Sequence, residues 1–301
     1  MQASPRPAVS IRRLPAADAQ ARSRFRLIAT ATAMALSLAF VASALAQPAA
    51  KSAGQNASQS ASKDDYVPDV GQDGKDVIWV PTPQSLVDKM LDMAKVTPQD
   101  RLMDLGSGDG RTVITAAQRG LTAQGIEYNP DLVELSRRNA QRAGVADRAT
   151  FVAADLFQTD LSKADVITMF LLSTINEKLR PTLLQLKPGT RVVSNTFRMG
   201  DWEPDASETV TKDCSTYCTA LLWIVPAKVE GKWEVDGQTL RLTQRYQMLS
   251  GKLGASDISD ARLDGNAISF TVNGVRYNGQ VNGKTMSGTA AGKGAWTATR
   301  A

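Results

Sequence analysis

The apolar positions between residues 76 and 227 follow two alternating spacings. Short continuous apolar runs, typical of buried strands, are separated by stretches whose apolar side chains recur every three or four residues, typical of helices. Val87, Met90 and Leu91, for example, fall on one helical face. This alternation predicts an α/β fold, a largely parallel sheet with helices on both faces. The predicted strands are residues 101–105, 123–127, 150–153, 166–170 and 191–194; the predicted helices are 84–94, 112–119, 130 onward and 175–185; and a closing hairpin is predicted at 208–212 and 219–225.

The pattern changes after Pro226, where short runs of alternating polarity are punctuated by Asn-Gly and Asp-Gly pairs. Such pairs are the strongest short-range signal of β-hairpins. Residues 228–301 are therefore predicted to form a second, small antiparallel β domain of six to eight strands, either a barrel or a half-barrel. Its expected aromatic core is Trp233, Phe270, Tyr277 and Trp296.

The first 46 residues have the pattern of a secretory signal peptide. Arginines precede an apolar run from Leu27 to Ala46, which ends in the small-x-small sequence Ala44-Leu45-Ala46. The run is also long enough to be a membrane anchor, so association with a membrane through residues 27–46 stays open. Residues 47–66 have the composition of a linker without fixed structure. The expected domains are thus 67–227 and 228–301, and the expected location is periplasmic, or anchored in the inner membrane.

Charge and composition restrict the chemistry. The net charge of +5 comes from the leader, which holds six arginines and one acidic residue, whereas the remaining residues are balanced. Bulk charge therefore gives no support for a nucleic-acid partner.

The chain has no histidine, which excludes Ser-His-Asp catalysis and histidine-containing metal sites, so no metal is expected. The two cysteines, Cys214 and Cys218, flank a predicted hairpin turn and are either disulfide-bonded or free.

The segment with the clearest chemistry is residues 103–111, Met-Asp-Leu-Gly-Ser-Gly-Asp-Gly-Arg. A predicted strand enters it, a predicted helix leaves it, and an acidic residue, Glu127, ends the next strand. A dinucleotide-binding turn has the spacing Gly-x-Gly-x-x-Gly, but its third glycine position is occupied here by Arg111. The observed order, Asp-x-Gly-x-Gly-x-Gly, resembles the first motif of class I methyltransferases that use S-adenosylmethionine (SAM), and implies their Rossmann-like sheet.

The resemblance implies a cofactor site at the carboxyl ends of the strands. Asp104 is expected to accept hydrogen bonds from the ammonium group of SAM, and Glu127 from the ribose hydroxyls. Asp155 is expected to accept from the adenine amino group, with Leu156 packing nearby. The predicted cofactor residues are Asp104, Gly106, Ser107, Gly108, Gly110, Glu127, Tyr128, Asp155 and Leu156.

A more specific resemblance covers residues 68–210. Val80-Pro81-Thr82-Pro83 and Arg191-Val192-Val193, followed by Phe197 and Trp202-Glu203-Pro204, occur in the same order in the protein-lysine methyltransferases of the ATP synthase c-subunit and the adenine nucleotide translocase. This similarity implies transfer of a methyl group to a protein lysine or small amine. Trp79, Phe170 and Trp202 are the predicted catalytic-channel residues, with Asn195 and Asp201 as nearby polar contacts.

Two alternatives stay open. Because SAM is made in the cytosol, an exported domain could be a catalytically silent binding protein, although the intact Asp104, glycines and Glu127 argue against this. A small-molecule methyltransferase would use the same cofactor site. The sequence does not indicate the acceptor, the oligomeric state or the role of the β domain.

Overall fold

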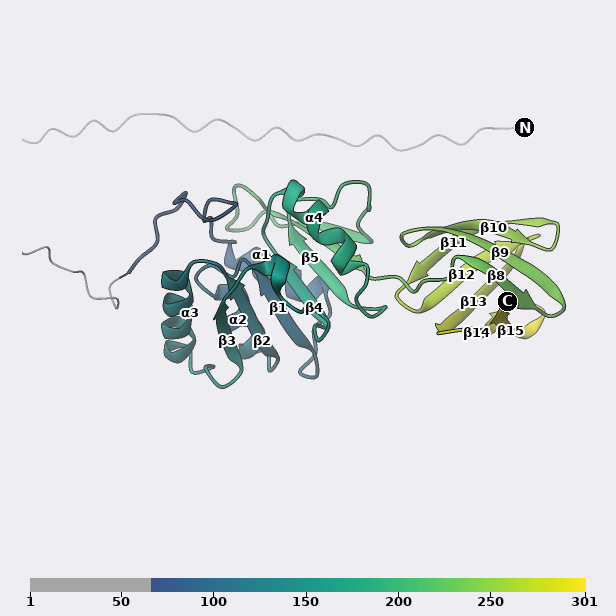
Figure 1. The fold of residues 1–301 in the computed structure, drawn as a ribbon, viewed down its shortest axis with the longest axis horizontal. Helices are drawn as coiled ribbons and strands as arrows, with labels where there is room; N and C mark the ends of the chain where they lie inside the picture. Colours follow the sequence, from purple (N-terminus) through teal and green to yellow (C-terminus); the bar gives the residue numbers. More distant parts are fainter. Residues whose placement is uncertain (1–65) are drawn as a thin grey trace, which may run out of the picture. The chain divides into compact units, whose positions relative to one another are not determined.

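The computed structural model describes residues 66–301 and contains a seven-stranded sheet followed by a closed β-barrel (Figure 1). The predicted leader and nearly all of the predicted linker lie outside the described residues. The sheet order is β3-β2-β1-β4-β5-β7-β6. Strands β1 to β5 are parallel, β7 is antiparallel to β5, and β6 is antiparallel to β7. The strands are β1 Arg101–Leu105, β2 Thr122–Glu127, β3 Ala149–Ala153, β4 Val166–Met169, β5 Arg191–Asn195, β6 Ala206–Thr209 and β7 Thr219–Ile224.

Helices cover both faces of this sheet, as the alternating pattern predicts. Two separate apolar clusters result, one containing side chains from α1, α2 and α3 and the other containing side chains from α4. At the start of α3, the Asn129 side chain accepts a hydrogen bond from Asp131 N at 2.9 Å, and Pro130 occupies the first helical position, where no amide is needed. The fold class inferred from the sequence is therefore confirmed. The helices are α1 Gln84–Met93, α2 Arg111–Gln118, α3 Pro130–Arg142 and α4 Ser173–Leu183.

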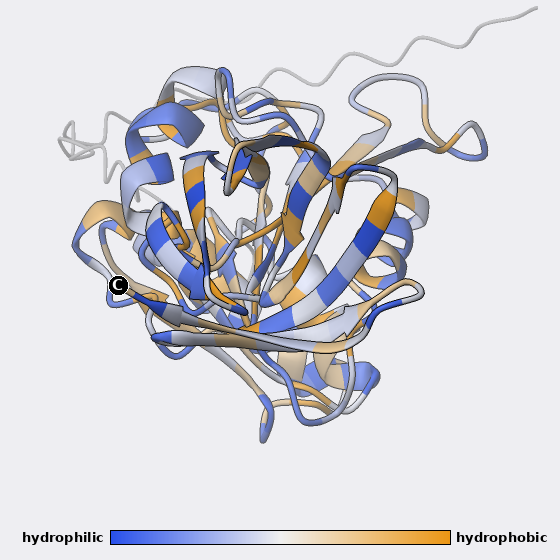
Figure 2. Cartoon of the chain, turned by 90° about the vertical axis from the view of Figure 1, so that its right-hand side faces the viewer, coloured by the Kyte–Doolittle hydropathy of each residue, from blue (hydrophilic) through white to orange (hydrophobic). Residues whose placement is uncertain are grey.

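The C-terminal domain is an eight-stranded antiparallel barrel that closes by pairing β15 with β8. Hydrophobic and hydrophilic residues alternate along its strands (Figure 2), and the inward positions are buried. Phe270, Tyr277 and Trp296 stack or meet edge to face, with ring centroids 4.8 to 5.9 Å apart. These rings and the buried Trp233 fill the interior as expected. The strands are β8 Gly231–Val235, β9 Gln238–Arg245, β10 Met248–Leu253, β11 Ser256–Asp264, β12 Ala267–Val272, β13 Val275–Asn282, β14 Thr285–Ala290 and β15 Gly294–Arg300.

Polar contacts join the barrel to the segment between β5 and β6. Gln247 accepts a hydrogen bond from Trp202 Nε1 at 2.9 Å and donates to the Glu203 carbonyl at 2.8 Å. Arg262 pairs with Asp205 at 2.9 Å. Burial raises the pKa of Asp205 despite this pairing. Within residues 66–301, no helix is long and apolar enough to cross a membrane.

Candidate active site

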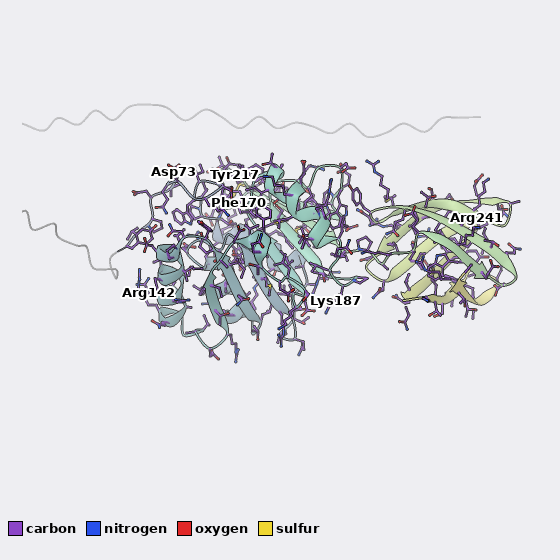
Figure 3. All side chains as sticks on the ribbon, in the orientation of Figure 1. Asp73, Arg142, Phe170, Lys187, Tyr217 and Arg241 are labelled. Atoms are coloured by element: carbon purple, nitrogen blue, oxygen red, sulfur yellow. A yellow bond between two sulfur atoms is a disulfide. The ribbon has the colours of Figure 1, made fainter. Side chains whose placement is uncertain are left out.

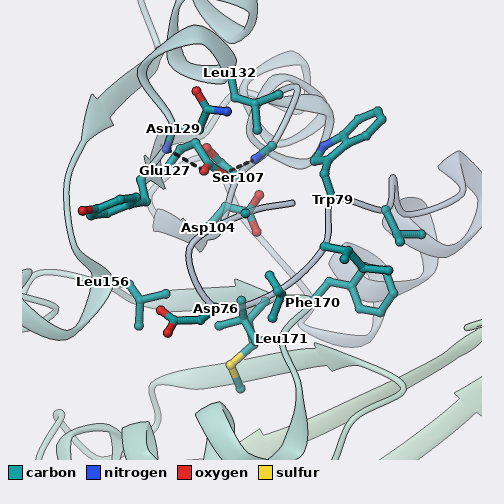
Figure 4. A pocket seen from close by; sticks show the side chains of 18 of the residues that line it. Asp76, Trp79, Asp104, Ser107, Glu127, Asn129, Leu132, Leu156, Phe170 and Leu171 are labelled. Atoms are coloured by element: carbon teal, nitrogen blue, oxygen red, sulfur yellow. Dashed lines mark hydrogen bonds between the residues drawn. The ribbon is translucent and has the colours of Figure 1, made fainter. Parts of the chain in front are cut away.

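A cavity of about 470 Å³ opens at the carboxyl ends of the parallel strands. This is the edge of an open α/β sheet where ligands bind. Its lining comes largely from the segment before α1 and from the loops that follow β1, β2, β3 and β4 (Figure 4), and it also includes Phe197 and Tyr217. The lining includes Trp79, Asp104, Gly106, Ser107, Gly108, Glu127, Tyr128, Asp155, Leu156 and Phe170.

The loop between β1 and α2 bends tightly over β2. Gly106 N and Ser107 N both donate to the Ile126 carbonyl, at 2.8 and 3.1 Å. Gly108 has φ +54°, in the left-handed region that favours glycine. A Cβ at this position would lie 2.6 Å from Trp79 Nε1. The missing side chain therefore allows the Trp79 ring to lie directly against the loop.

The sequence pattern predicts that Gly110 contacts the cofactor, but the structure places it outside the pocket lining. It is buried, has φ +83° and occupies the N-cap position of α2. A Cβ there would come within 2.8 Å of the Phe151 ring and 3.0 Å of Ser136 Cβ. The glycine is needed because α2 starts close to β3 and α3, so its role is packing and the prediction is corrected.

Asp104 is a buried carboxyl group without a cationic partner in the described residues. It is 6% exposed, and Oδ1 accepts a hydrogen bond from Thr168 Oγ1 at 2.6 Å. Burial raises its pKa to about 7, since the Thr168 hydrogen bond offsets only part of the desolvation and the charges of Glu127 and Asp109 add to it. Ser107 Oγ, also buried, has no hydrogen-bond partner among the described residues. A cationic, hydrogen-bonding ligand would satisfy both groups.

Glu127, the last residue of β2, is held by two backbone amides. Oε2 accepts from Gly108 N at 2.9 Å, and Oε1 accepts from Asn129 N at 3.0 Å. Each oxygen keeps a further lone pair, so the carboxylate can still accept from a pair of hydroxyl groups. This arrangement fits the ribose-binding role expected for Glu127, which stays a prediction.

At the next strand end, Asp155 has a partner that the sequence did not reveal. Oδ2 pairs with Lys75 Nζ at 2.7 Å, and Oδ1 accepts from Phe157 N at 2.9 Å, capping the short helix η2, Leu156–Gln158. The Lys75 hydrogen bond and the Phe157 amide lower the pKa of Asp155. Lys75 Nζ also lies 4.6 Å from the centre of the Tyr128 ring. These contacts attach the segment before α1 to the predicted adenine end of the pocket.

The same segment supplies Trp79, which lines the pocket, while its role in an acceptor channel stays a prediction. Trp79 N donates to the Gln72 carbonyl at 2.9 Å. Arg111 Nη1 donates to the Thr82 carbonyl at 2.9 Å, and Asn195 Nδ2 donates to Thr82 Oγ1 at 3.3 Å. Asn195 is buried outside the pocket lining, so it supports the segment and does not contact the pocket, contrary to the sequence-based expectation.

The three predicted channel residues separate into two groups. Phe170 and Trp79 face the cavity (Figure 4). Trp202 does not line it: the indole is fully buried between Trp223 and Tyr246, with ring centroids 6.3 and 5.8 Å away. Asp201 likewise lies outside the pocket lining, paired with Arg180 of α4 and with Arg245 of the barrel strand β9. The channel prediction is therefore wrong for Trp202, and the expectation that Asp201 is a polar contact near the channel is also wrong.

The residues brought together fit SAM. Asp104 and Ser107 would hold its amino-acid end, the glycine loop its centre and Glu127 its ribose, while Phe170 and Trp79 face the remaining space. No group of three or more metal-ligating side chains occurs within residues 66–301. The fold and this pocket define a class I SAM-dependent methyltransferase.

Comparisons with known proteins identify the family. The model of the ANTKMT methyltransferase domain matches residues 104–206. A protein-lysine N-methyltransferase of Saccharolobus islandicus is 46% identical over 131 residues, which are 42% of this chain and 81% of that protein. This chain belongs to the protein-lysine N-methyltransferase family.

Two further proteins are similar to parts of this chain. The mouse lysine N-methyltransferase of the ATP synthase c-subunit is 41% identical over 105 residues, 35% of this chain and 42% of that enzyme, so the chain spans less than half of its length. A crystal structure titled RNA methyltransferase from Salinibacter ruber, in complex with S-adenosyl-L-homocysteine, is 49% identical, with a TM-score of 0.47, and covers 50% of this chain and 96% of that one.

Proposed function

We propose that the enzyme transfers the methyl group of SAM to the side-chain amine of a protein lysine. The names of the relatives support this acceptor. The observation that carries the proposal is the shape of the pocket, which runs from the buried Asp104 carboxyl to an apolar end with Trp79 and Phe170. One end suits the cofactor, and the other suits an alkyl chain ending in a neutral amine.

The chemistry asks for positioning more than for proton transfer. When bound, SAM supplies a methyl group already activated on a sulfonium sulfur. The protein must hold the amine in line with this group and in its unprotonated form. The rings of Trp79 and Phe170 make the acceptor end apolar, and desolvation there would lower the pKa of an entering ammonium group. The absence of histidine from the chain is compatible with this mechanism.

The acceptor is tested by methyl transfer from isotope-labelled SAM to a bacterial cell extract. We expect the label in the protein fraction and, after acid hydrolysis, in methyllysine. A Glu127→Ala variant is the control and should transfer little label. Label confined to small molecules, to nucleic acid or to another amino acid would contradict the lysine proposal while leaving the methyltransferase class intact.

We further propose that the domain is exported. The proposal rests on the arginine-preceded apolar run that ends at Ala46. The bond between Cys214 and Cys218 supports it, because disulfides persist mainly in oxidising compartments.

Expression of the full chain in a Gram-negative host tests the export proposal. We expect a periplasmic protein whose mass corresponds to a chain beginning at Gln47. A Leu36→Arg variant, which interrupts the apolar run, should remain unprocessed. A full-length protein in the membrane fraction would show an anchor, and a full-length soluble protein would contradict both interpretations of the leader.

A further inference from the structure

Three aromatic rings meet at the end of the pocket farthest along the sheet from Glu127. Phe170 follows β4, Phe197 follows β5, and Tyr217 lies at the tip of the β6–β7 hairpin. The ring centroids are 5.9 Å apart for Phe170 and Phe197, 5.3 Å for Phe170 and Tyr217, and 5.7 Å for Phe197 and Tyr217. All three rings line the cavity. Figure 3 shows Phe170 and Tyr217 at the same end of the methyltransferase domain.

The two phenylalanines are fixed by the sheet. Phe170 comes directly after the buried strand β4. The Phe197 carbonyl accepts from Ser194 Oγ at 2.8 Å and from Asn176 Nδ2 at 3.1 Å, and both of these residues are buried. These side chains therefore form a preorganised wall.

Tyr217 is held differently, because it belongs to an exposed hairpin tip. It is 43% exposed and has φ +56°, a left-handed conformation that is unfavourable for a bulky residue. Its neighbour Cys218 is bonded to Cys214, with Cα atoms 5.8 Å apart, so a five-residue covalent ring contains Tyr217. A strained residue of this kind persists only where its surroundings impose it.

The base of the hairpin directs this ring toward Phe197. Val210 N donates to the Cys218 carbonyl at 2.9 Å, which continues the β6–β7 pairing up to the disulfide. Thr196 N donates to the Thr219 carbonyl at 2.7 Å, which fixes the start of β7 beside the Phe197 loop. The remaining tip residues, 211–216, are mostly exposed, so Tyr217 is restrained by the disulfide beside it and by its ring contacts with Phe170 and Phe197.

We propose that Tyr217 is an acceptor-site residue and that the Cys214–Cys218 disulfide positions it, so that the acceptor end of the pocket is complete only when the hairpin is oxidised. This inference rests on the proposed lysine acceptor and specifies its subsite. The rings of Tyr217, Phe170 and Phe197 touch one another, so the acceptor side chain would pass along the side of this cluster that lines the cavity. Reduction would release the tip and remove one side of this passage, while the cofactor residues, which lie on other loops, would keep their contacts.

Two ligands separate the cofactor site from the acceptor site. S-adenosylhomocysteine occupies the cofactor site alone. A bisubstrate analogue, in which nitrogen replaces the sulfur and carries the Nε atom of a capped lysine through a two-carbon linker, also occupies the acceptor end. Calorimetry on the full chain gives the ratio of the two affinities. This ratio measures how much the acceptor end of the pocket contributes to binding.

We expect the wild-type protein to bind the bisubstrate analogue at least tenfold more tightly than S-adenosylhomocysteine. Tyr217→Ala and the double variant Cys214→Ser/Cys218→Ser should each reduce this ratio at least fivefold, with unchanged affinity for S-adenosylhomocysteine. Tyr217→Phe, which keeps the ring, should retain it. A phosphine reductant should lower the ratio for the wild-type protein and leave the double serine variant unchanged.

The variant that combines all three substitutions tests whether the disulfide acts through Tyr217. For this variant, the ratio of the affinities for the bisubstrate analogue and S-adenosylhomocysteine should be no lower than for Tyr217→Ala. The reason is that the effects of substitutions do not add when one residue acts through the other. If Tyr217→Ala kept the wild-type ratio of affinities, the inference about Tyr217 would be overturned, whereas the proposed lysine acceptor would be unaffected. Loss of S-adenosylhomocysteine binding in these variants would show a general structural role instead and would also overturn it. If the wild-type protein bound the bisubstrate analogue no more tightly than S-adenosylhomocysteine, the proposed lysine acceptor itself would be contradicted.

Discussion

Asp104→Asn is expected to weaken SAM binding at least tenfold and, at the same time, to stabilise the ligand-free protein. The substitution keeps the shape of the side chain and an oxygen for Thr168, but removes the charge that would pair with the ammonium group of SAM. A hydrogen bond to a charged group contributes about 1.5–3 kcal/mol, which corresponds to a loss of roughly ten- to 100-fold in affinity.

The gain in stability follows from the raised pKa of Asp104, about 7 in the folded protein. The unfolded chain releases this proton near pH 4, whereas the folded chain keeps it until about pH 7. Stability therefore falls as the pH rises from 4 to 7, and above pH 7 the full cost of a buried charge is present. At pH 8, asparagine should raise the free energy of unfolding by up to about 4 kcal/mol. This advantage should decrease toward pH 4.

Thermal denaturation at several pH values and calorimetry with SAM test both effects. For the wild-type protein, the affinity for SAM should decline below pH 7, because the carboxyl group must lose a proton before it can pair with the ammonium group. The asparagine variant should lose this pH dependence. Asp160→Asn, at an exposed site outside the pocket, is the matched control for SAM affinity. A variant with lower stability than wild type at pH 8 would contradict the account of Asp104.

Trp202→Ala is expected to destabilise the protein strongly without changing the cofactor site. Trp202 is fully buried against Trp223 and Tyr246, and its indole donates to Gln247 in the barrel. Removal of such a side chain costs about 3–5 kcal/mol, and here it also leaves the Gln247 oxygen without its donor. For a protein of this size we expect the melting temperature to fall by about 10 °C.

The matched control is Trp79→Ala, which removes the same side chain from the pocket lining. Because Trp79 is only partly buried, its loss should affect stability less and methyl transfer more. Thermal denaturation and SAM calorimetry at a temperature where both variants are folded separate the two effects. Weaker SAM binding in Trp202→Ala with little loss of stability would restore the channel role and contradict the structure-based assignment.

The sequence predicts those features that depend on local spacing. The strand, the glycine turn and the helix around Asp104 lie within one short segment, and Glu127 follows at the end of the next strand. The repeated Asn-Gly and Asp-Gly turns likewise indicate an antiparallel domain. The sequence left open whether this domain is a barrel or a half-barrel. The barrel closes through the pairing of Ala298 with Val235, which joins segments far apart in the chain.

Features that depend on tertiary packing are predicted less well. Gly110 has the same local pattern as Gly106 and Gly108, but only the position of Phe151 shows that it serves packing. Trp202 is a long-range contact of Gln247, 45 residues away, which no local pattern indicates. The pairing of Lys75 with Asp155 and the meeting of Tyr217 with Phe170 also link distant segments. The chemistry of the cofactor end could therefore be inferred from the sequence, whereas the acceptor end required the fold.

The central claim, that this pocket binds SAM through Glu127 and Asp104, is tested most directly by calorimetry with SAM on the purified wild-type and Glu127→Ala proteins. The account predicts a dissociation constant in the micromolar range for the wild-type protein and a loss of at least tenfold, about 1.4 kcal/mol, on substitution. No binding to the folded wild-type protein at millimolar SAM, or equal affinities of the two proteins, would contradict it.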